Sequence, residues 1–266
     1  MREGLHLAPY GTVRRDNGQM EVVPFGGVAR YMPSGSLDLS STVPLDELRT
    51  NIEECGAAYL DVAGTLSDNP EAAITFGNLH RVDRYWGHWD WPLDTFREGI
   101  RFLKGGMDKD EILLFAAGYA HERIVPELRD ETIEALLRYM PPLYEGVEKG
   151  VSLLQDRMDV VLVSSGLEAT TKRTAEKVGV EDFHYREEKK GPVIVKDAKK
   201  RGTRKILIVG DSPIDRKAAN YARRYGGLDV TMLSVDKHFD PFFLDRRVNA
   251  AIPRKWNGVV DLLTDH

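Results

Sequence analysis

The chain contains four short apolar runs, and each is followed by a turn and then by a segment with helical periodicity. The runs comprise residues 57–60, 160–163, 206–210 and 230–233. Short runs of this kind, mostly β-branched, are typical of parallel strands that are buried on both faces. Strands that alternate with helices form βαβ units. The sequence therefore predicts an α/β fold with a three-layer, Rossmann-like parallel sheet.

A long segment separates the first run from the second, and most of it has the periodicity of helices. Asn17-Gly18, between two segments of strand character, predicts a β-hairpin near the start of the chain. We therefore expect an N-terminal extension (1–43), a core domain in two pieces (44–67 and 146–266) and an inserted helical cap (68–145).

Composition excludes several classes of protein. The 266 residues are 42% hydrophobic and 30% charged, which is typical of a folded globular protein and not of a disordered one. A single cysteine, Cys55, excludes an intramolecular disulfide and a cysteine-based zinc site. No apolar run of about 18 residues and no signal-like N-terminal segment is present, so we expect a cytoplasmic protein that does not span a membrane.

The charge pattern bears on possible partners. The net charge of −5 gives no bulk attraction to nucleic acid. Residues 189–205 contain eight lysines and arginines, but no aromatic residues are interleaved for base stacking. We interpret most of this segment as the solvated face of a helix. The expected partner is a small phosphorylated molecule, without nucleic acid or membrane, and a homodimer is left open.

Polar residues follow three of the predicted strands. Asp61 follows the first strand, Ser164 the second, and Asp211 and Asp215 the third. The carboxyl ends of parallel strands meet at one edge of a sheet, where α/β proteins bind their ligands. We expect these side chains to converge there, with Lys190 reaching in from a loop.

Such a group of residues suits phosphoryl transfer. Carboxylates with few nitrogen ligands favour Mg²⁺, which keeps several waters and binds phosphate oxygens. A serine hydroxyl and a lysine ammonium can hold the other phosphoryl oxygens. An aspartate can attack phosphorus as a nucleophile. Phosphoryl transfer mainly requires positioning and neutralisation of charge, and these residue types supply both.

At these residues the chain resembles the haloacid dehalogenase-like (HAD) hydrolase superfamily. The resemblance covers about residues 57–264 and rests on four motifs in order, together with the insertion after the first. The motifs are Asp61-Val62-Ala63-Gly64-Thr65, Ser164-Ser165-Gly166, Lys190 and Gly210-Asp211-Ser212-Pro213-Ile214-Asp215. Phe102 to Gly106 and Leu143 to Val147 also resemble the caps and linkers of the phosphoserine-phosphatase-like branch.

The resemblance implies a role for each motif. Asp61 would be the nucleophile and a Mg²⁺ ligand. The backbone carbonyl of Ala63 would be a second ligand, with Asp211 as a third and Asp215 behind it. The phosphoryl group would be bound by Lys190 and by the segment Ser164, Ser165 and Gly166.

Ala63 departs from the pattern of the phosphatases, which have an aspartate there as general acid/base. Such a group contributes roughly 10²–10⁴-fold to the rate. Phosphonoacetaldehyde hydrolases resemble the chain in having Asp-x-Ala-Gly-Thr, and they add a cap lysine that forms a Schiff base; Lys104 is the candidate here. The intact segment around Asp211 argues against dehalogenation. The alternatives to a phosphomonoester hydrolase are therefore cleavage of a P–C bond and a catalytically weak binding protein.

Three tryptophans crowd residues 85–91 in the predicted cap. One interpretation is that they anchor the cap core. The other is that Trp86 and Trp89 line the substrate entrance, where flat rings would stack on an apolar or ring-bearing leaving group.

Overall fold

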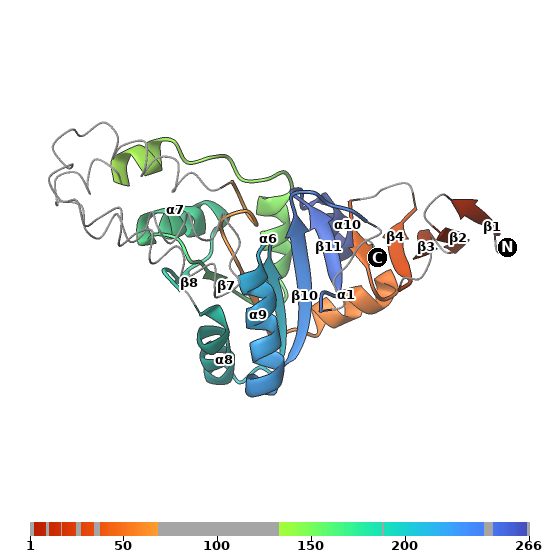
Figure 1. Ribbon diagram of the computed structural model, residues 1–266. Coiled ribbons are helices and arrows are strands. Elements are labelled where there is room, and N and C mark those ends of the chain that lie inside the picture. Colours follow the sequence, from red (N-terminus) through yellow and green to blue (C-terminus); the bar gives the residue numbers. More distant parts are fainter. Residues whose placement is uncertain are drawn as a thin grey trace, which may run out of the picture.

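The computed structural model describes residues 3–8, 11–16, 18–24, 28–34, 38–68, 133–187, 189–241 and 247–264. Within these ranges all the strands belong to one sheet, in the order β1-β2-β3-β4-β5-β11-β10-β9-β6-β7-β8 (Figure 1). From β11 to β8 each neighbouring pair is parallel. The predicted α/β class, with a central parallel sheet, is confirmed.

The strands are short, as expected from the apolar runs. Those of the parallel part are β6 (Ala57–Leu60), β7 (Asp159–Val163), β8 (Asp182–His184), β9 (Lys205–Gly210), β10 (Asp229–Asp236) and β11 (Ala250–Pro253). Those of the antiparallel part are β1 (Glu3–Ala8), β2 (Gly11–Asp16), β3 (Gln19–Pro24), β4 (Arg30–Pro33) and β5 (Ser40–Ser41).

The helices follow the strands along the chain. They are α1 (Leu45–Glu53), α6 (Val147–Gln155), α7 (Glu168–Val178), α8 (Lys190–Arg201), α9 (Pro213–Tyr221), a π-helical turn (Ala222–Gly226) and α10 (Asn257–Thr264).

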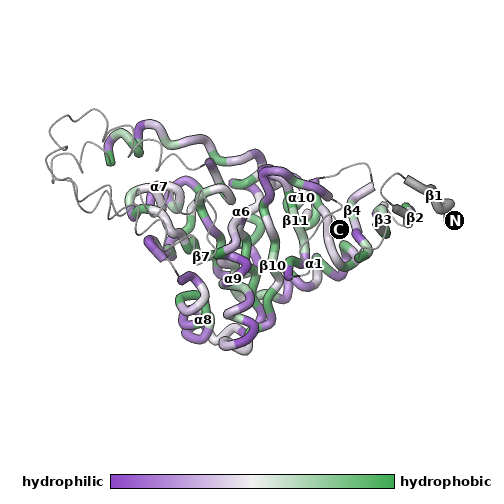
Figure 2. The backbone as a smooth tube through the Cα atoms, viewed as in Figure 1, coloured by the Kyte–Doolittle hydropathy of each residue, from purple (hydrophilic) through white to green (hydrophobic). Residues whose placement is uncertain are grey.

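Two separate hydrophobic cores lie on the two faces of the parallel sheet. On one face Ala58 and Leu60 of β6 pack with apolar residues of α1, α6, α7 and α10. On the other face Ala57 and Tyr59 of the same strand pack with α8 and α9. Alternate residues of a strand point to opposite faces, so a run that is apolar throughout needs helices on both. Figure 2 shows hydrophobic residues, in green, along the strands at the centre of the molecule, as expected for a sheet that helices cover on both faces.

The N-terminal strands continue the sheet beyond its parallel part. β2 and β3 form a hairpin in which Asp16 pairs with Gln19, and Gly18 has a φ of 76°. The tight turns that join the strands of a hairpin require a positive φ, and glycine adopts this conformation readily. The sheet then passes through β4 to β5, which pairs antiparallel with β11. The N-terminal segment therefore covers what would otherwise be the β11 edge of the parallel sheet.

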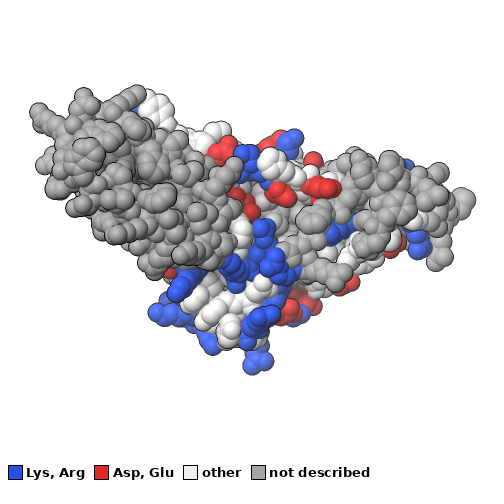
Figure 3. Space-filling model, viewed as in Figure 1, with Lys and Arg blue, Asp and Glu red and all other residues white. Residues whose placement is uncertain are grey.

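Six of the eight basic residues between positions 189 and 205 are exposed, and three of these six lie on α8. Lys196, Lys199 and Lys200 are exposed, and Figure 3 shows lysine and arginine side chains gathered in the region of α8 and α9. Arg201 is an exception because it binds three carboxylates, those of Asp159, Asp182 and Asp197. This arginine ties the start of β7 and the start of β8 to α8.

The structure corrects one expectation and adds two strands to the parallel part of the sheet, besides β1, β4 and β5 in the antiparallel part. Lys190 does not come from a loop: it is the first residue of α8. β8 and β11 were not expected, because they are only 3 and 4 residues long and carry little strand signal.

Residues 69–132 lie outside the described ranges. The predicted cap (68–145) and its candidate residues Trp86, Trp89 and Lys104 therefore stay predictions, as does the division into domains. Residues 133–138, within the last part of that segment, are helical. In the described ranges no helix combines the length and the apolar character that crossing a membrane requires.

Candidate active site

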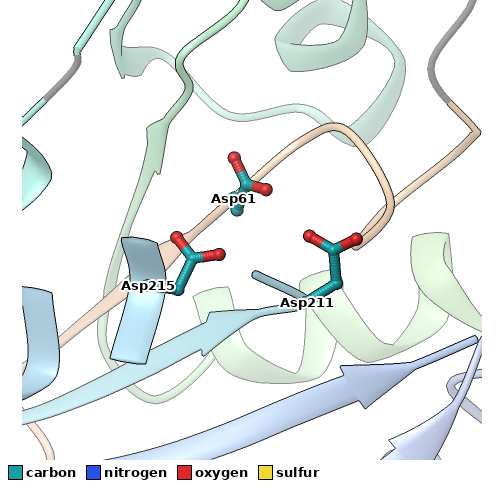
Figure 4. Close-up of side chains that lie close together, drawn as sticks. All are labelled: Asp61, Asp211 and Asp215. Carbon is teal, nitrogen blue, oxygen red and sulfur yellow. The ribbon is translucent and has the colours of Figure 1, made fainter. Parts of the chain in front are cut away.

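Three carboxylates converge at the carboxyl edge of the parallel sheet. Asp61 directly follows β6, Asp211 directly follows β9, and Asp215 lies in the first turn of α9 (Figure 4). β6 and β9 are parallel neighbours with Leu60 opposite Val209, so their next residues end at the same level. One carboxylate oxygen from each aspartate lies within 4.8 Å of the others. The expected convergence of these three residues is thus present in the structure.

Lys190 is the positive centre of the cluster. Its Nζ donates to Asp61 Oδ1 at 2.6 Å and to Asp215 Oδ1 at 2.7 Å. All three side chains are almost completely buried. Burial alone would lower the pKa of Lys190, but the charges of Asp215 and Asp61 outweigh it and raise the pKa. The ammonium therefore stays charged between two carboxylates.

Asp215 is also held by the start of its own helix. Its Oδ2 accepts from Ser212 Oγ at 2.7 Å and from the Ser212 amide at 3.1 Å. This is a capping box with Ser212 as the N-cap. Both oxygens of Asp215 therefore have partners within the protein, and Asp61 and Asp211 are the carboxylates more available to a ligand.

Gly64 allows the Asp61 loop to approach Asp211. Its backbone φ is 80°, a conformation that residues other than glycine rarely adopt. A Cβ at this position would lie 1.8 Å from Asp211 Oδ2. Glycine is therefore needed twice here, for the turn and for the space that the Asp211 carboxylate occupies.

With all three aspartates ionised, the cluster would carry more negative charge than the ammonium of Lys190 balances. Burial and the charges of Asp61 and Asp215 raise the pKa of Asp211 to about 9, although Lys190 and Arg254 oppose the shift. Burial also raises the pKa of Asp61, with Lys190 opposing and Asp215 adding to the shift. Three carboxylates that face one lysine offer only oxygen ligands and an unbalanced charge. This donor set fits a hard divalent cation such as Mg²⁺.

Ser164 lies at the same edge of the sheet, directly after β7. It is buried, and its Oγ accepts from the amide of Gly166 at 3.0 Å. Its own amide donates to the carbonyl of His184 in β8 at 2.9 Å. Ser165 points elsewhere, because its Oγ donates to the carbonyl of Glu187 at 3.0 Å. The hydroxyl of Ser164 is thus the better placed of the two to face a ligand.

Ala63 lies two residues beyond Asp61 and is partly exposed. The loop around it is held by backbone contacts: Ala63 forms a β-bridge with Ser67, and the Gly64 amide donates to the Ser67 carbonyl at 2.7 Å. The methyl group adds neither an acid nor a base to the cluster. Its backbone carbonyl as a cation ligand stays a prediction.

Arg254 was not expected at the site. It follows β11, and its Nη2 lies 4.0 Å from Asp211 Oδ2. Its Nη1 donates to Asp68 Oδ1 at 2.7 Å, and its guanidinium lies 5.6 Å from the centre of the Tyr144 ring. Arg254 and these three partners come from four distant segments of the chain, so no local sequence signal connects them.

No family model matches the sequence, and no curated protein matches it either. Solved structures do resemble its fold. A phosphoserine phosphatase in its apo form has a TM-score of 0.50 and 16% sequence identity, over 78% of this chain and 98% of that chain. A substrate-bound phosphoserine phosphatase complex has a TM-score of 0.53 and 16% identity, over 78% of this chain and 97% of the other. The predicted resemblance is therefore confirmed for the fold.

Proposed function

The chain has the HAD-like fold, and we propose that it is a Mg²⁺-dependent hydrolase of a small phosphorylated metabolite, with Asp61 as the nucleophile. The observation that carries this proposal is the bridge that Lys190 makes between Asp61 and Asp215, beside Asp211. A buried carboxylate at a strand end, next to a fixed ammonium and a site for a cation, is what nucleophilic attack on a phosphate requires.

Asp61 and Asp211 would hold the cation, with the Ala63 carbonyl as a further ligand and Asp215 behind them. The bound cation would neutralise charge on the phosphoryl oxygens and on the carboxylates. Lys190, Ser164 and the amides of the Ser164 loop would bind the remaining phosphoryl oxygens, as donors aimed at developing charge.

The chemistry has two steps. A carboxylate oxygen of Asp61 attacks phosphorus, the bond from phosphorus to the ester oxygen breaks, and the leaving alkoxide takes a proton. Water then attacks the phosphorus of the aspartyl-phosphate, loses a proton, and releases inorganic phosphate with Asp61 restored. During both steps Lys190 holds Asp61 Oδ1 and so fixes the direction of the other oxygen.

Ala63 limits this mechanism. With no carboxyl group at position 63, the proton for the leaving group must come from the substrate, from water or from the predicted cap. Positioned acid/base groups contribute roughly 10²–10⁴-fold. We therefore propose slow turnover of alkyl phosphates and faster turnover of esters whose leaving groups need no proton.

A panel of phosphomonoesters with Mg²⁺ tests the proposal through release of inorganic phosphate. Asp61→Asn should abolish release, because the amide is no nucleophile. Asp156→Asn, at an exposed position after α6, removes an equal charge and should retain full activity. Release that survives in Asp61→Asn would exclude Asp61 as the nucleophile.

The alternatives from the sequence predict other results. Cleavage of a P–C bond would appear as borohydride trapping of a phosphonate aldehyde that is lost in Lys104→Arg, a residue outside the described ranges. A binding protein would bind vanadate without turning over any substrate.

A further inference from the structure

Arg254 stands between two carboxylates that belong to different parts of the molecule. Nη1 donates to Asp68 Oδ1 at 2.7 Å, whereas Nη2 lies 4.0 Å from Asp211 Oδ2, which is too far for a hydrogen bond. Nε is buried and has no hydrogen-bond partner among the described residues. Asp68 therefore supplies the hydrogen bond that fixes the guanidinium.

Tyr144 strengthens the hold of Asp68. The tyrosine hydroxyl donates to the same Asp68 Oδ1 at 2.7 Å, and the Arg254 guanidinium lies over the tyrosine ring. The backbone of this pair is also fixed, because the Tyr144 amide donates to the Leu66 carbonyl at 2.8 Å and Ser67 bridges to Leu143. An exposed salt bridge alone would be weak, but these added contacts give Arg254 a defined place.

We propose that Asp68 and Tyr144 are positioning residues that hold Arg254 away from Asp211 and so leave that carboxylate available to the divalent cation. This inference rests on the cation site of the proposed function. Asp68 and Tyr144 would act only through Arg254, because neither belongs to the carboxylate cluster.

The argument is electrostatic. Among the residues that the structure describes, the carboxylate that Arg254 would approach without Asp68 is that of Asp211. A guanidinium that closes from 4.0 Å to hydrogen-bond contact would neutralise Asp211 and would have to be displaced before a cation could bind. At the effective dielectric of a protein surface, this shorter distance strengthens the attraction between Arg254 and Asp211. The cation must overcome this added attraction, which corresponds to a roughly tenfold weaker binding constant for the cation.

Binding of Mn²⁺ to the purified full chain tests the inference without any substrate. Free Mn²⁺ is measured by electron paramagnetic resonance for the wild type, Asp68→Asn, Arg254→Met and the double variant. We expect Asp68→Asn to bind Mn²⁺ roughly tenfold more weakly. Arg254→Met should bind at least as tightly as the wild type, and the double variant should match Arg254→Met.

Two controls separate this effect from simpler ones. Asp156→Asn removes an exposed carboxylate elsewhere and should leave Mn²⁺ binding unchanged. Tyr144→Phe keeps the ring but loses the hydroxyl, so it should weaken binding in the same direction by a smaller factor. It also provides a milder test if Asp68→Asn folds poorly.

The outcomes are distinct. If Asp68→Asn binds like the wild type, or if the double variant is as weak as Asp68→Asn alone, the inference is wrong. If the wild type binds no Mn²⁺, or binds it as well after Asp211→Asn, the cation site itself is wrong and the proposed function fails first.

Discussion

Replacing Lys190 with methionine should expose the electrostatic cost of the site. Methionine keeps a side chain of similar length in this buried position, but it removes the ammonium that contacts Asp61 Oδ1 and Asp215 Oδ1. Both carboxyl groups then remain buried without their shared counter-ion. Removal of one partner of a buried ion pair costs about 3–5 kcal/mol.

The loss should depend on pH in a defined direction. Burial already raises the pKa of Asp61 to about 7 in the presence of Lys190, and without the lysine this pKa must rise further. A carboxyl group with a raised pKa in the folded state stabilises the fold as pH falls, because the folded state then binds the proton more tightly. Lys190→Met should therefore lower the free energy of unfolding by about 3–5 kcal/mol at pH 8 and by clearly less at pH 5.

Urea unfolding in the presence of a chelator measures both values. Lys196→Met is the matched control, because Lys196 is an exposed lysine of the same helix and should change the free energy of unfolding by less than about 0.5 kcal/mol. The reasoning would be refuted if Lys190→Met resembled Lys196→Met, or if its cost were the same at both pH values.

Three further predictions concern the same site. Gly64→Ala places a Cβ 1.8 Å from Asp211 Oδ2 at a φ of 80°, so it should lower stability by at least about 1–2 kcal/mol and abolish Mn²⁺ binding; an unchanged urea midpoint and unchanged binding would contradict the geometry. Because the pKa of Asp211 is raised from 3.8 to about 9, the cation-free fold should lose stability as pH rises across this window, and bound Mg²⁺ should remove the penalty. The increase in melting temperature on adding saturating Mg²⁺ should thus be larger at pH 8.5 than at pH 6, and a larger increase at pH 6 would reverse the assignment. Ala63→Asp should raise release of phosphate from alkyl phosphates by roughly 10²-fold or more, while a rate equal to that of the wild type would show that another group already serves as acid/base.

The sequence predicted the parts of the fold that depend on local pattern. Apolar runs that are buried on both faces identify parallel strands, and they placed Asp61 and Asp211 at strand ends of one sheet. The structure adds that these two strands are neighbours. β8 and β11 escaped prediction because strands of 3 and 4 residues carry too few residues for a period to show.

Lys190 shows how a local rule can mislead. Gly191 and Pro192 directly follow it, and this pair predicts a loop. In the structure they lie in the first turn of α8, where a proline is tolerated because the amide it lacks would have no partner within the helix. The lysine therefore approaches Asp61 from a rigid helix and not from a loop.

The contacts of Arg254 could not be predicted from the sequence. Arg254 and Asp68 are 186 positions apart, and Asp68 and Tyr144 are 76 positions apart. Only the folded sheet brings their segments together. Tyr144 lies in the stretch Leu143 to Val147 that resembles the family, but Asp68 and Arg254 belong to no motif. Pairing over such distances is a property of the folded chain.

Phosphorylation of Asp61 itself can be measured. Acetyl phosphate labelled with ³²P is mixed with the protein and Mg²⁺, the reaction is quenched in acid, and the labelled peptide is identified by mass spectrometry. The mechanism predicts a label that hydroxylamine removes, located on Asp61 and absent from Asp61→Asn. Release of labelled phosphate without any labelled protein, or a label that persists in Asp61→Asn, would contradict it.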